Sequence, residues 1–145
     1  IAPDRTAIRL SPGLAMWGID EGVEGRDLYR HLVPELDRLG LAYLHIMQAG
    51  DEPLLGDIRK LWHRTLILNR PGRPRDQIGA DVASGLADLE SFGQMILANP
   101  DFVSRLNSGA PLNEADRNSF FGGTEKGYTD YPVWADARLE QTAVR

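Results

Sequence analysis

Short apolar segments alternate with helical patterns along the chain, and this alternation predicts the fold. Four segments are strand-like, and a loop and a helical pattern follow each of them: Ala7 to Leu10, Ala42 to Met47, Thr65 to Leu68, and Ala87 to Phe92. Parallel neighbouring strands need a crossover connection, which is usually a helix. The pattern therefore indicates an α/β fold with a parallel sheet of βα units.

The stretch after the first strand carries an apolar stripe suited to packing on such a sheet. Leu28, Leu32, Leu36 and Leu39 recur at spacings of four and three, and Pro34 interrupts them. Because proline removes an amide donor and clashes with the preceding turn, we expect a kink there or two short helices.

Two further helices follow the next two strands. We expect the first to use Asp57 as its N-terminal cap and to turn Ile58, Leu61 and Trp62 inward. We expect the second to run from about Arg75 to Ser84.

Four βα units amount to half of a (β/α)8 TIM barrel. A complete barrel typically takes about 250 residues, whereas this chain has 145. The chain also lacks an initiator methionine and leads almost directly into a strand, so we expect it to be part of something longer.

Composition narrows the class of protein. The chain is 42% hydrophobic and 26% charged, which is typical of a soluble globular protein. A net charge of -5 provides no basic surface for nucleic acid, and no apolar run is long enough to span a membrane. The absence of cysteine excludes disulfides, thiolate metal sites and a cysteine nucleophile, and it is compatible with a cytoplasmic protein.

Candidate binding residues lie where strands end. In parallel α/β folds, ligands bind at the carboxyl ends of strands, and the last loops of a barrel often hold a phosphate. Gly72 and Gly93 leave room for such a group to approach the backbone, although spacing alone favours simple turns. Arg9 lies inside an apolar strand, so its guanidinium either reaches a ligand heteroatom or forms a surface salt bridge.

Aromatic residues in the glycine-rich loops have two interpretations. Trp17, Phe120, Phe121, Tyr128 and Tyr131 could wall a pocket for a flat ligand or pin the tail, and we favour pinning for the two tyrosines. The three histidines show no metal-ligand spacing, so we expect no metal site. Hydrolase, NTPase and Rossmann motifs are absent from the sequence.

Several motifs, taken in order, resemble the Old Yellow Enzyme family of flavin-dependent ene reductases. They are Ile8-Arg9-Leu10-Ser11-Pro12, Leu39-Gly40-Leu41-Ala42-Tyr43-Leu44-His45, Gly85-Leu86-Ala87-Asp88, Phe92-Gly93, Ala98-Asn99-Pro100-Asp101, and Phe120-Phe121-Gly122-Gly123 with Gly127-Tyr128-Thr129-Asp130-Tyr131-Pro132. The resemblance covers only the C-terminal half of the family's TIM barrel. It implies residues 1–132 as a flavin-binding half-barrel and 133–145 as a C-terminal tail.

The resemblance implies FMN as cofactor, NAD(P)H as reductant and an activated alkene as substrate. Arg9 is similar to the arginine beside the pyrimidine side of the flavin, where positive charge favours the anionic reduced ring. Gly72 and Gly93 match backbone positions around the FMN phosphate. Gln94 stands where the family commonly has an arginine, which removes a charge and a fork of donors. Phe120 resembles an aromatic near the dimethylbenzene edge.

The same resemblance places Phe121 and Trp17 at the substrate pocket. Phe121 stands where many members have a tyrosine, so it keeps the wall and lacks the hydroxyl donor. The family's substrate-orienting His/Asn pair and its tyrosine proton donor come from the N-terminal half. We therefore expect no catalytic residue in this chain and little activity without the missing half-barrel.

Two other functions remain open. The chain could be a non-catalytic half-barrel that covers its exposed sheet edges by self-association. It could also be a phosphate-binding scaffold that recognises sugar phosphates without flavin.

Overall fold

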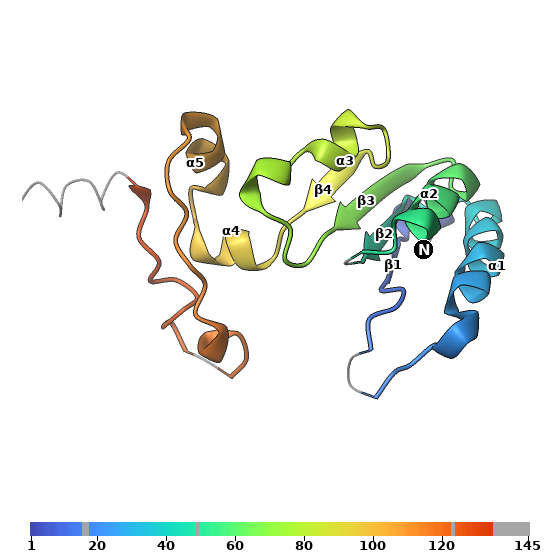
Figure 1. The fold of residues 1–145 in the computed structure, drawn as a ribbon, viewed down its shortest axis with the longest axis horizontal. Helices are drawn as coiled ribbons and strands as arrows, with labels where there is room; N and C mark the ends of the chain where they lie inside the picture. The colour runs from blue at the N-terminus through green and yellow to red at the C-terminus, as the bar shows by residue number, and fades with distance from the viewer. Residues whose placement is uncertain (16–17, 49, 123, 135–145) are drawn as a thin grey trace, which may run out of the picture. The chain divides into compact units, whose positions relative to one another are not determined.

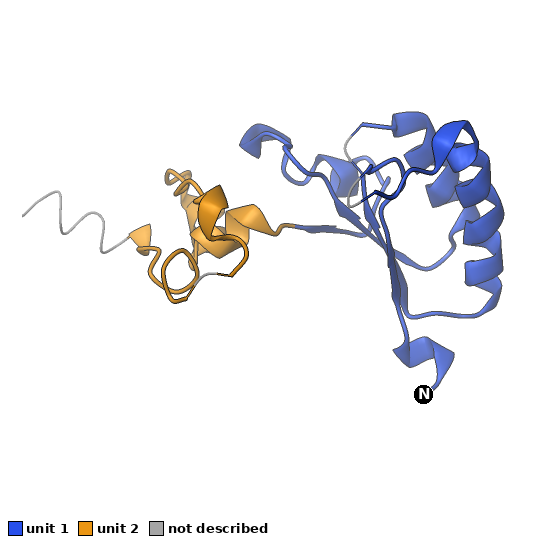
Figure 2. Ribbon diagram, turned by 90° about the horizontal axis from the view of Figure 1, so that it is seen from below, with its two compact units in different colours: residues 1–91 blue, residues 92–145 orange. Residues whose placement is uncertain are grey.

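The computed structural model describes residues 1–15, 18–48, 50–122 and 124–134. The chain divides into two compact units, Ile1–Ser91 and Phe92–Arg145, which Figure 2 distinguishes by colour.

The first unit is built on a parallel sheet with strand order β1-β2-β3-β4 (Figure 1). Its strands are β1 (Ile8–Leu10), β2 (Tyr43–Met47), β3 (Thr65–Asn69) and β4 (Leu89–Ser91). Its helices are α1 (Gly25–Arg38), α2 (Glu52–Leu61) and α3 (Ala80–Ala83), with 3-10 turns η1 (Pro3–Arg5), η2 (Gly22–Glu24) and η3 (Arg75–Gln77). The predicted parallel α/β sheet is confirmed.

The core lies between one face of this sheet and the first two helices. Leu44 and Ile46 of β2 and Leu66 and Leu68 of β3 are at most 1% exposed, and they belong to one apolar cluster with the buried faces of α1 and α2. The intervening strand residues are more exposed, because successive side chains of a strand point to opposite faces.

Helix α1 differs from the prediction in two ways. It runs through Pro34 as one helix rather than as two short helices, and it buries Tyr29 and Val33 together with Leu36 of the predicted stripe. Leu28, which the predicted stripe turned inward, is 49% exposed. Tyr29, Val33 and Leu36 also recur at spacings of four and three. The buried face of the helix therefore has the predicted period and is rotated by about one residue.

The next two helices start or break where local residues dictate. Asp51, and not Asp57, caps α2, because its carboxylate accepts the Leu54 amide while Pro53 occupies the first turn, where its missing N–H costs nothing. The predicted helix from Arg75 to Ser84 is broken. Gly79 adopts φ 87° between η3 and α3, which interrupts helical geometry.

The second unit contains α4 (Gln94–Ala98), α5 (Phe102–Ser108) and the 3-10 turn η4 (Arg117–Ser119). Phe92 and Phe102 pack with ring centroids 5.3 Å apart, and Gly109 ends α5 at φ 68°. None of the helices in the described ranges is long and apolar enough to cross a membrane.

Candidate functional site

The sheet face opposite the core carries most of the polar strand side chains of the first unit. We call it the open face, and it consists of Arg9, Tyr43, His45, Met47, Thr65, Ile67, Asn69, Leu89 and Ser91. Strand register places its central residues in one row across the sheet: Arg9, His45, Ile67 and Leu89. Leu89 is 53% exposed there, so the open face presents apolar as well as polar groups.

Arg9 supplies positive charge to this face. Its Nη2 lies 2.9 Å from Sδ of Met47, which is a weak acceptor. Among the residues that the structure describes, no carboxylate lies within ion-pair distance of Arg9. Its guanidinium therefore retains donors for an anionic or strongly accepting ligand.

His45 is the register neighbour of Arg9, and it is held in place across β3. Its Nε2 lies 2.8 Å from Oγ of Ser91, while Nδ2 of Asn69 donates to the Ser91 carbonyl at 2.7 Å. Burial lowers the pKa of the imidazole, and the nearby charge of Arg9 lowers it further. The row therefore combines a charged donor with an imidazole that favours its neutral form.

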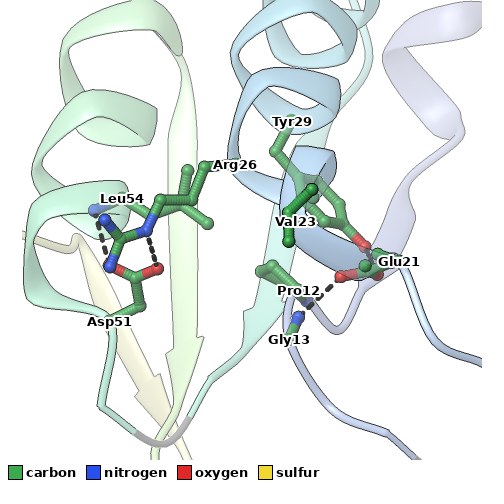
Figure 3. A pocket seen from close by; sticks show the side chains of 10 residues that line it. Pro12, Gly13, Glu21, Val23, Arg26, Tyr29, Asp51 and Leu54 are labelled. Carbon is green, nitrogen blue, oxygen red and sulfur yellow. Dashed lines mark hydrogen bonds and ion pairs between the residues drawn. The ribbon is translucent and has the colours of Figure 1, made fainter.

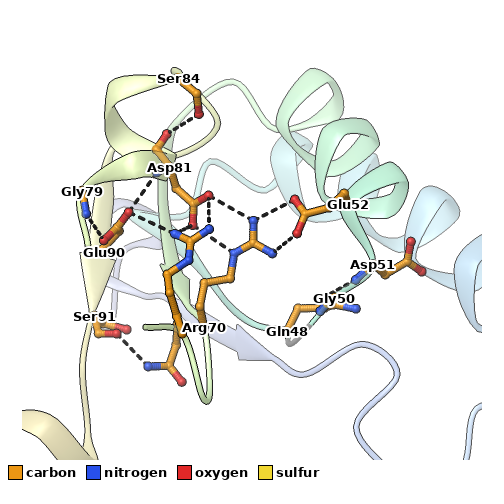
Figure 4. A network of polar contacts seen from close by, with 12 residues as sticks. Gln48, Gly50, Asp51, Glu52, Arg70, Gly79, Asp81, Ser84, Glu90 and Ser91 are labelled. Atoms are coloured by element: carbon orange, nitrogen blue, oxygen red, sulfur yellow. Dashed lines mark hydrogen bonds and ion pairs between the residues drawn. The ribbon is translucent and has the colours of Figure 1, made fainter. Parts of the chain in front are cut away.

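Two arginines beyond the end of β3 form ion pairs with three carboxylates, and we call this group the closed network: Glu52, Arg70, Arg73, Asp81 and Glu90. Figure 4 shows the contacts of Arg70 with Glu52 and Asp81. Arg70 donates to both carboxylate oxygens of Asp81 at 2.9 and 3.0 Å and to Glu52 at 2.7 and 2.9 Å. Arg73 donates to the same two Asp81 oxygens at 2.6 and 2.9 Å. Both guanidiniums are thus already engaged by carboxylates.

Burial makes these contacts structural. The side chains of Arg70 and Asp81 are 8% and 5% exposed. Burial alone would raise the pKa of Asp81, but the hydrogen bonds from Arg70 and Arg73 outweigh it and hold the pKa below its usual range. Glu90 completes the network by accepting the backbone amides of Gly79 and Asp81.

A cavity of about 380 Å³ lies beside the loop that follows β1, where α1 and α2 begin (Figure 3). Glu21 accepts the Tyr29 hydroxyl and the Gly13 amide, and Asp51 accepts Arg26 at 2.7 Å. Burial raises the pKa of the Tyr29 phenol, and its bond to Glu21 adds to the effect. Glu21 therefore links Gly13 to Tyr29 of α1, and the Arg26–Asp51 pair links the starts of α1 and α2.

The residues predicted from the sequence fall in both units. Arg9 ends with its side chain on the open face, and Gly72 adopts φ 76° in the turn after β3, with open space where a side chain would begin. Arg9 lies in β1 and Gly72 lies after the carboxyl end of β3, and both strands belong to the same parallel sheet.

The remaining predicted residues belong to the second unit or lie outside the description. Gly93 immediately precedes α4 and Gln94 is its first residue. Phe120 is half-buried after η4, and Phe121 is 85% exposed. Trp17 lies outside the described residues. That these positions form one site with Arg9 and Gly72 stays a prediction.

Sequence reasoning missed His45 and Ser91 as members of the open face. His45 shares strand parity with Arg9 once the two strands are paired, which is the signal that could have found it. Ser91 gave no such signal, because its contact with His45 spans an intervening strand.

Comparison with known proteins gives relatives along nearly the whole chain. No family model matches it. A 12-oxophytodienoate reductase-like protein of Solanum lycopersicum is 36% identical over 135 residues, covering 91% of this chain and 37% of that protein. A probable flavin mononucleotide-dependent alkene reductase of Leishmania infantum is 33% identical over 138 residues, covering 91% and 37%.

Solved structures agree with the sequence relatives. The structure of the old yellow enzyme from Trypanosoma cruzi matches with a TM-score of 0.79 and 31% identity, covering 91% of this chain and 36% of that one. The chain belongs to the Old Yellow Enzyme family. It spans less than half the length of the relatives it matches. Members of the family are TIM barrels, so the four-stranded sheet is part of such a barrel, as predicted.

Proposed function

We propose that this chain supplies the cofactor-contacting part of an FMN-dependent ene reductase of the Old Yellow Enzyme family. The observation that carries the proposal is Arg9, a cation without a described carboxylate partner on the open face of a partial barrel. The interior face of a barrel at the carboxyl ends of its strands is where TIM-barrel enzymes bind their ligands.

The open face fits the polar edge of a flavin. A guanidinium offers donors and charge to the ring atoms that become electron-rich on reduction. His45 beside it favours its neutral form, so Arg9 remains the charge that the ring would meet. In this proposal FMN, when bound, supplies hydride transfer from NAD(P)H to an activated alkene.

The proposed phosphate contacts offer less charge than the proposed contact of Arg9 with the ring. Gly72 and Gly93 both have open space where a side chain would begin, which suits the approach of a phosphate to the backbone. Gln94 offers an uncharged amide there, and the two arginines near Gly72 are held by Asp81. We therefore propose that ring contacts contribute more to cofactor affinity in this chain than phosphate contacts do.

Phe120, Phe121 and Trp17 complete the proposal as aromatic neighbours of the flavin and the substrate. Catalytic proton transfer is assigned to the complementary half of the barrel, because no residue of this chain matches the family's substrate-orienting or proton-donating positions. We propose that activity requires that half.

Titration of FMN with the purified chain, followed by flavin fluorescence and the visible absorption band, tests the proposal. The same titration with an added N-terminal half-barrel of a relative tests the requirement for a second half. We expect binding and a shifted flavin band, and NAD(P)H oxidation only in the reconstituted pair. Absence of FMN binding in both samples contradicts the proposal. Equal competition by ribose 5-phosphate would favour a phosphate-binding scaffold instead.

Self-association is a second candidate, and the exposed apolar groups of the open face favour it. Tyr43 and Leu89 are large and exposed, and within the described residues β1 and β4 each pair on one side only. Light scattering distinguishes the candidates, since a folded monomer in dilute solution rules out self-association as the cover for this surface.

A further inference from the structure

In the second unit, one buried arginine joins the two ends of a long loop. We call residues 112–131 the clamped loop, because the carbonyls of Pro111 and Pro132, which flank it, both accept hydrogen bonds from Arg105. Nη1 of Arg105 lies 2.8 Å from the Pro111 oxygen, and Nη2 lies 2.6 Å from the Pro132 oxygen. Residues separated by 21 positions in the sequence thus meet on a single guanidinium.

Arg105 itself is fixed from within α5. Its side chain is 1% exposed, and its Nε donates to Asp101 one helical turn earlier at 2.6 Å. The other oxygen of Asp101 accepts the Trp134 amide at 2.8 Å, and the Trp134 ring lies 6.0 Å from the Arg105 guanidinium carbon. Only a planar fork of donors serves these acceptors together, so lysine cannot replace it in full.

The clamped loop is also braced internally. The Tyr131 hydroxyl accepts the Asp116 amide at 2.8 Å, and the Tyr128 hydroxyl donates to the Phe120 carbonyl. Gly127 packs so closely on Ser119 that an added Cβ would lie 2.0 Å from its hydroxyl oxygen. The two tyrosine hydroxyls thus contact residues of the tail itself, and that of Tyr128 holds the backbone of Phe120.

We propose that Arg105 is a positioning residue: by closing the base of the clamped loop, it sets where Phe120 and Phe121 stand toward the cofactor and substrate. The choice of FMN as the ligand rests on the proposed function, and the closure of the loop rests on the contacts of Arg105. A loop held in its binding conformation before the ligand arrives costs less ordering on binding.

Amide hydrogen exchange of the whole chain tests the clamp without any ligand. Arg105→Lys should speed exchange across residues 112–131 by about tenfold or more while leaving β2 and β3 protected. Arg117→Lys, the same substitution at an exposed site within the loop, is the matched control and should change nothing outside its own turn. Unchanged exchange in Arg105→Lys overturns the proposal.

Gly127→Ala provides a second route, because it opens the loop without touching the guanidinium. It should speed exchange around Phe120 while the amides of α5 stay protected. If Gly127→Ala and Arg105→Lys both leave Phe120 unaffected in a folded chain, the loop is not held in this way and the inference fails.

A double-mutant cycle on FMN affinity links the clamp to the ligand. Arg105→Lys and Phe120→Ala should each raise the dissociation constant by about tenfold, and the double variant by about tenfold rather than a hundredfold. Additive effects would show that Arg105 does not act through Phe120, which overturns the positioning role. If the wild-type chain binds no FMN even with its complementary half, the proposed function fails, and hydrogen exchange alone decides the clamp.

Discussion

Arg9 and the Arg70–Arg73 pair belong to the same unit of this chain, yet only the pair is neutralised by carboxylates among the described residues. Arg9 is exposed on the sheet and contacts a thioether. The side chains of Arg70 and Arg73 are only 8% and 15% exposed, and both contact the buried Asp81, with Glu52 and Glu90 beside them. The comparison separates a guanidinium available to a ligand from two that the fold has already used.

Desolvation explains why the two cases differ. A buried guanidinium without a partner would destabilise the fold severely, so Arg70 and Arg73 require carboxylates nearby. An exposed guanidinium is hydrated and needs no partner. Its freedom lets Arg9 exchange water for a ligand.

The largest expected effect comes from breaking the closed network. Asp81→Asn removes the charge shared by Arg70 and Arg73 while keeping the side-chain shape. We expect a loss of about 3 kcal/mol in the free energy of unfolding, because the hydrogen bonds from Arg70 and Arg73 lose their charged, buried acceptor. Chemical denaturation measures it.

Asp27→Asn is the matched control for this prediction. Asp27 pairs with Arg30 on the surface of α1, where both side chains are exposed, so its neutralisation should cause no resolvable change in stability. Equal free energies of unfolding for Asp81→Asn and Asp27→Asn would contradict the structural role of the closed network.

The second largest effect is expected at Arg9, the arginine without a described carboxylate partner. Arg9→Met should leave stability nearly unchanged and weaken FMN binding by roughly tenfold or more, since a hydrogen bond from a charged group contributes about 1.5–3 kcal/mol. Flavin fluorescence titration measures the affinity.

Arg5→Met serves as its control, because Arg5 is an exposed arginine of η1, outside the sheet. Equal affinities for wild type and Arg9→Met, with FMN bound in both, would remove Arg9 from the cofactor site.

Arg9 and the closed network also differ in how far the sequence predicts them. Strand positions follow a local period of two, so all four strands and the placement of Arg9 beside apolar neighbours were accessible from the pattern. The closed network could not be predicted from the pattern. Arg70 and Asp81 are 11 residues apart, and the pattern predicted a helix across Gly79, where the structure has a break.

Helix α1 shows a second limit of pattern reading. The stripe through Leu28 and Leu32 and the stripe through Tyr29 and Val33 have the same spacing, so periodicity does not choose between them. The structure favours the second, in which the Tyr29 hydroxyl reaches Glu21 while its ring joins the core. A contact with a residue outside the helix therefore decides which face is buried.

A smaller effect is expected at Gln94, the proposed phosphate contact. Gln94→Arg should improve FMN affinity by about fivefold, because a charged donor to phosphate contributes roughly 1 kcal/mol more than a neutral one. Riboflavin, which lacks the phosphate, is the matched ligand, and its affinity should not change. An equal gain for both ligands would place residue 94 away from the phosphate.

The smallest expected effect is a shift in the pKa of His45, which lies beside Arg9 on the open face. The pKa of His45 is lowered first by burial and then by Arg9, so Arg9→Met should raise it without restoring the ordinary value of about 6.5. Because the folded-state pKa lies below the unfolded one, His45 favours folding above about pH 6.5, and this contribution is lost as the pH falls through the folded-state pKa. NMR titration of the imidazole in wild type and Arg9→Met measures the shift. An unchanged pKa would mean that the Arg9 charge is screened at His45, in which case it would act weakly on a bound flavin as well.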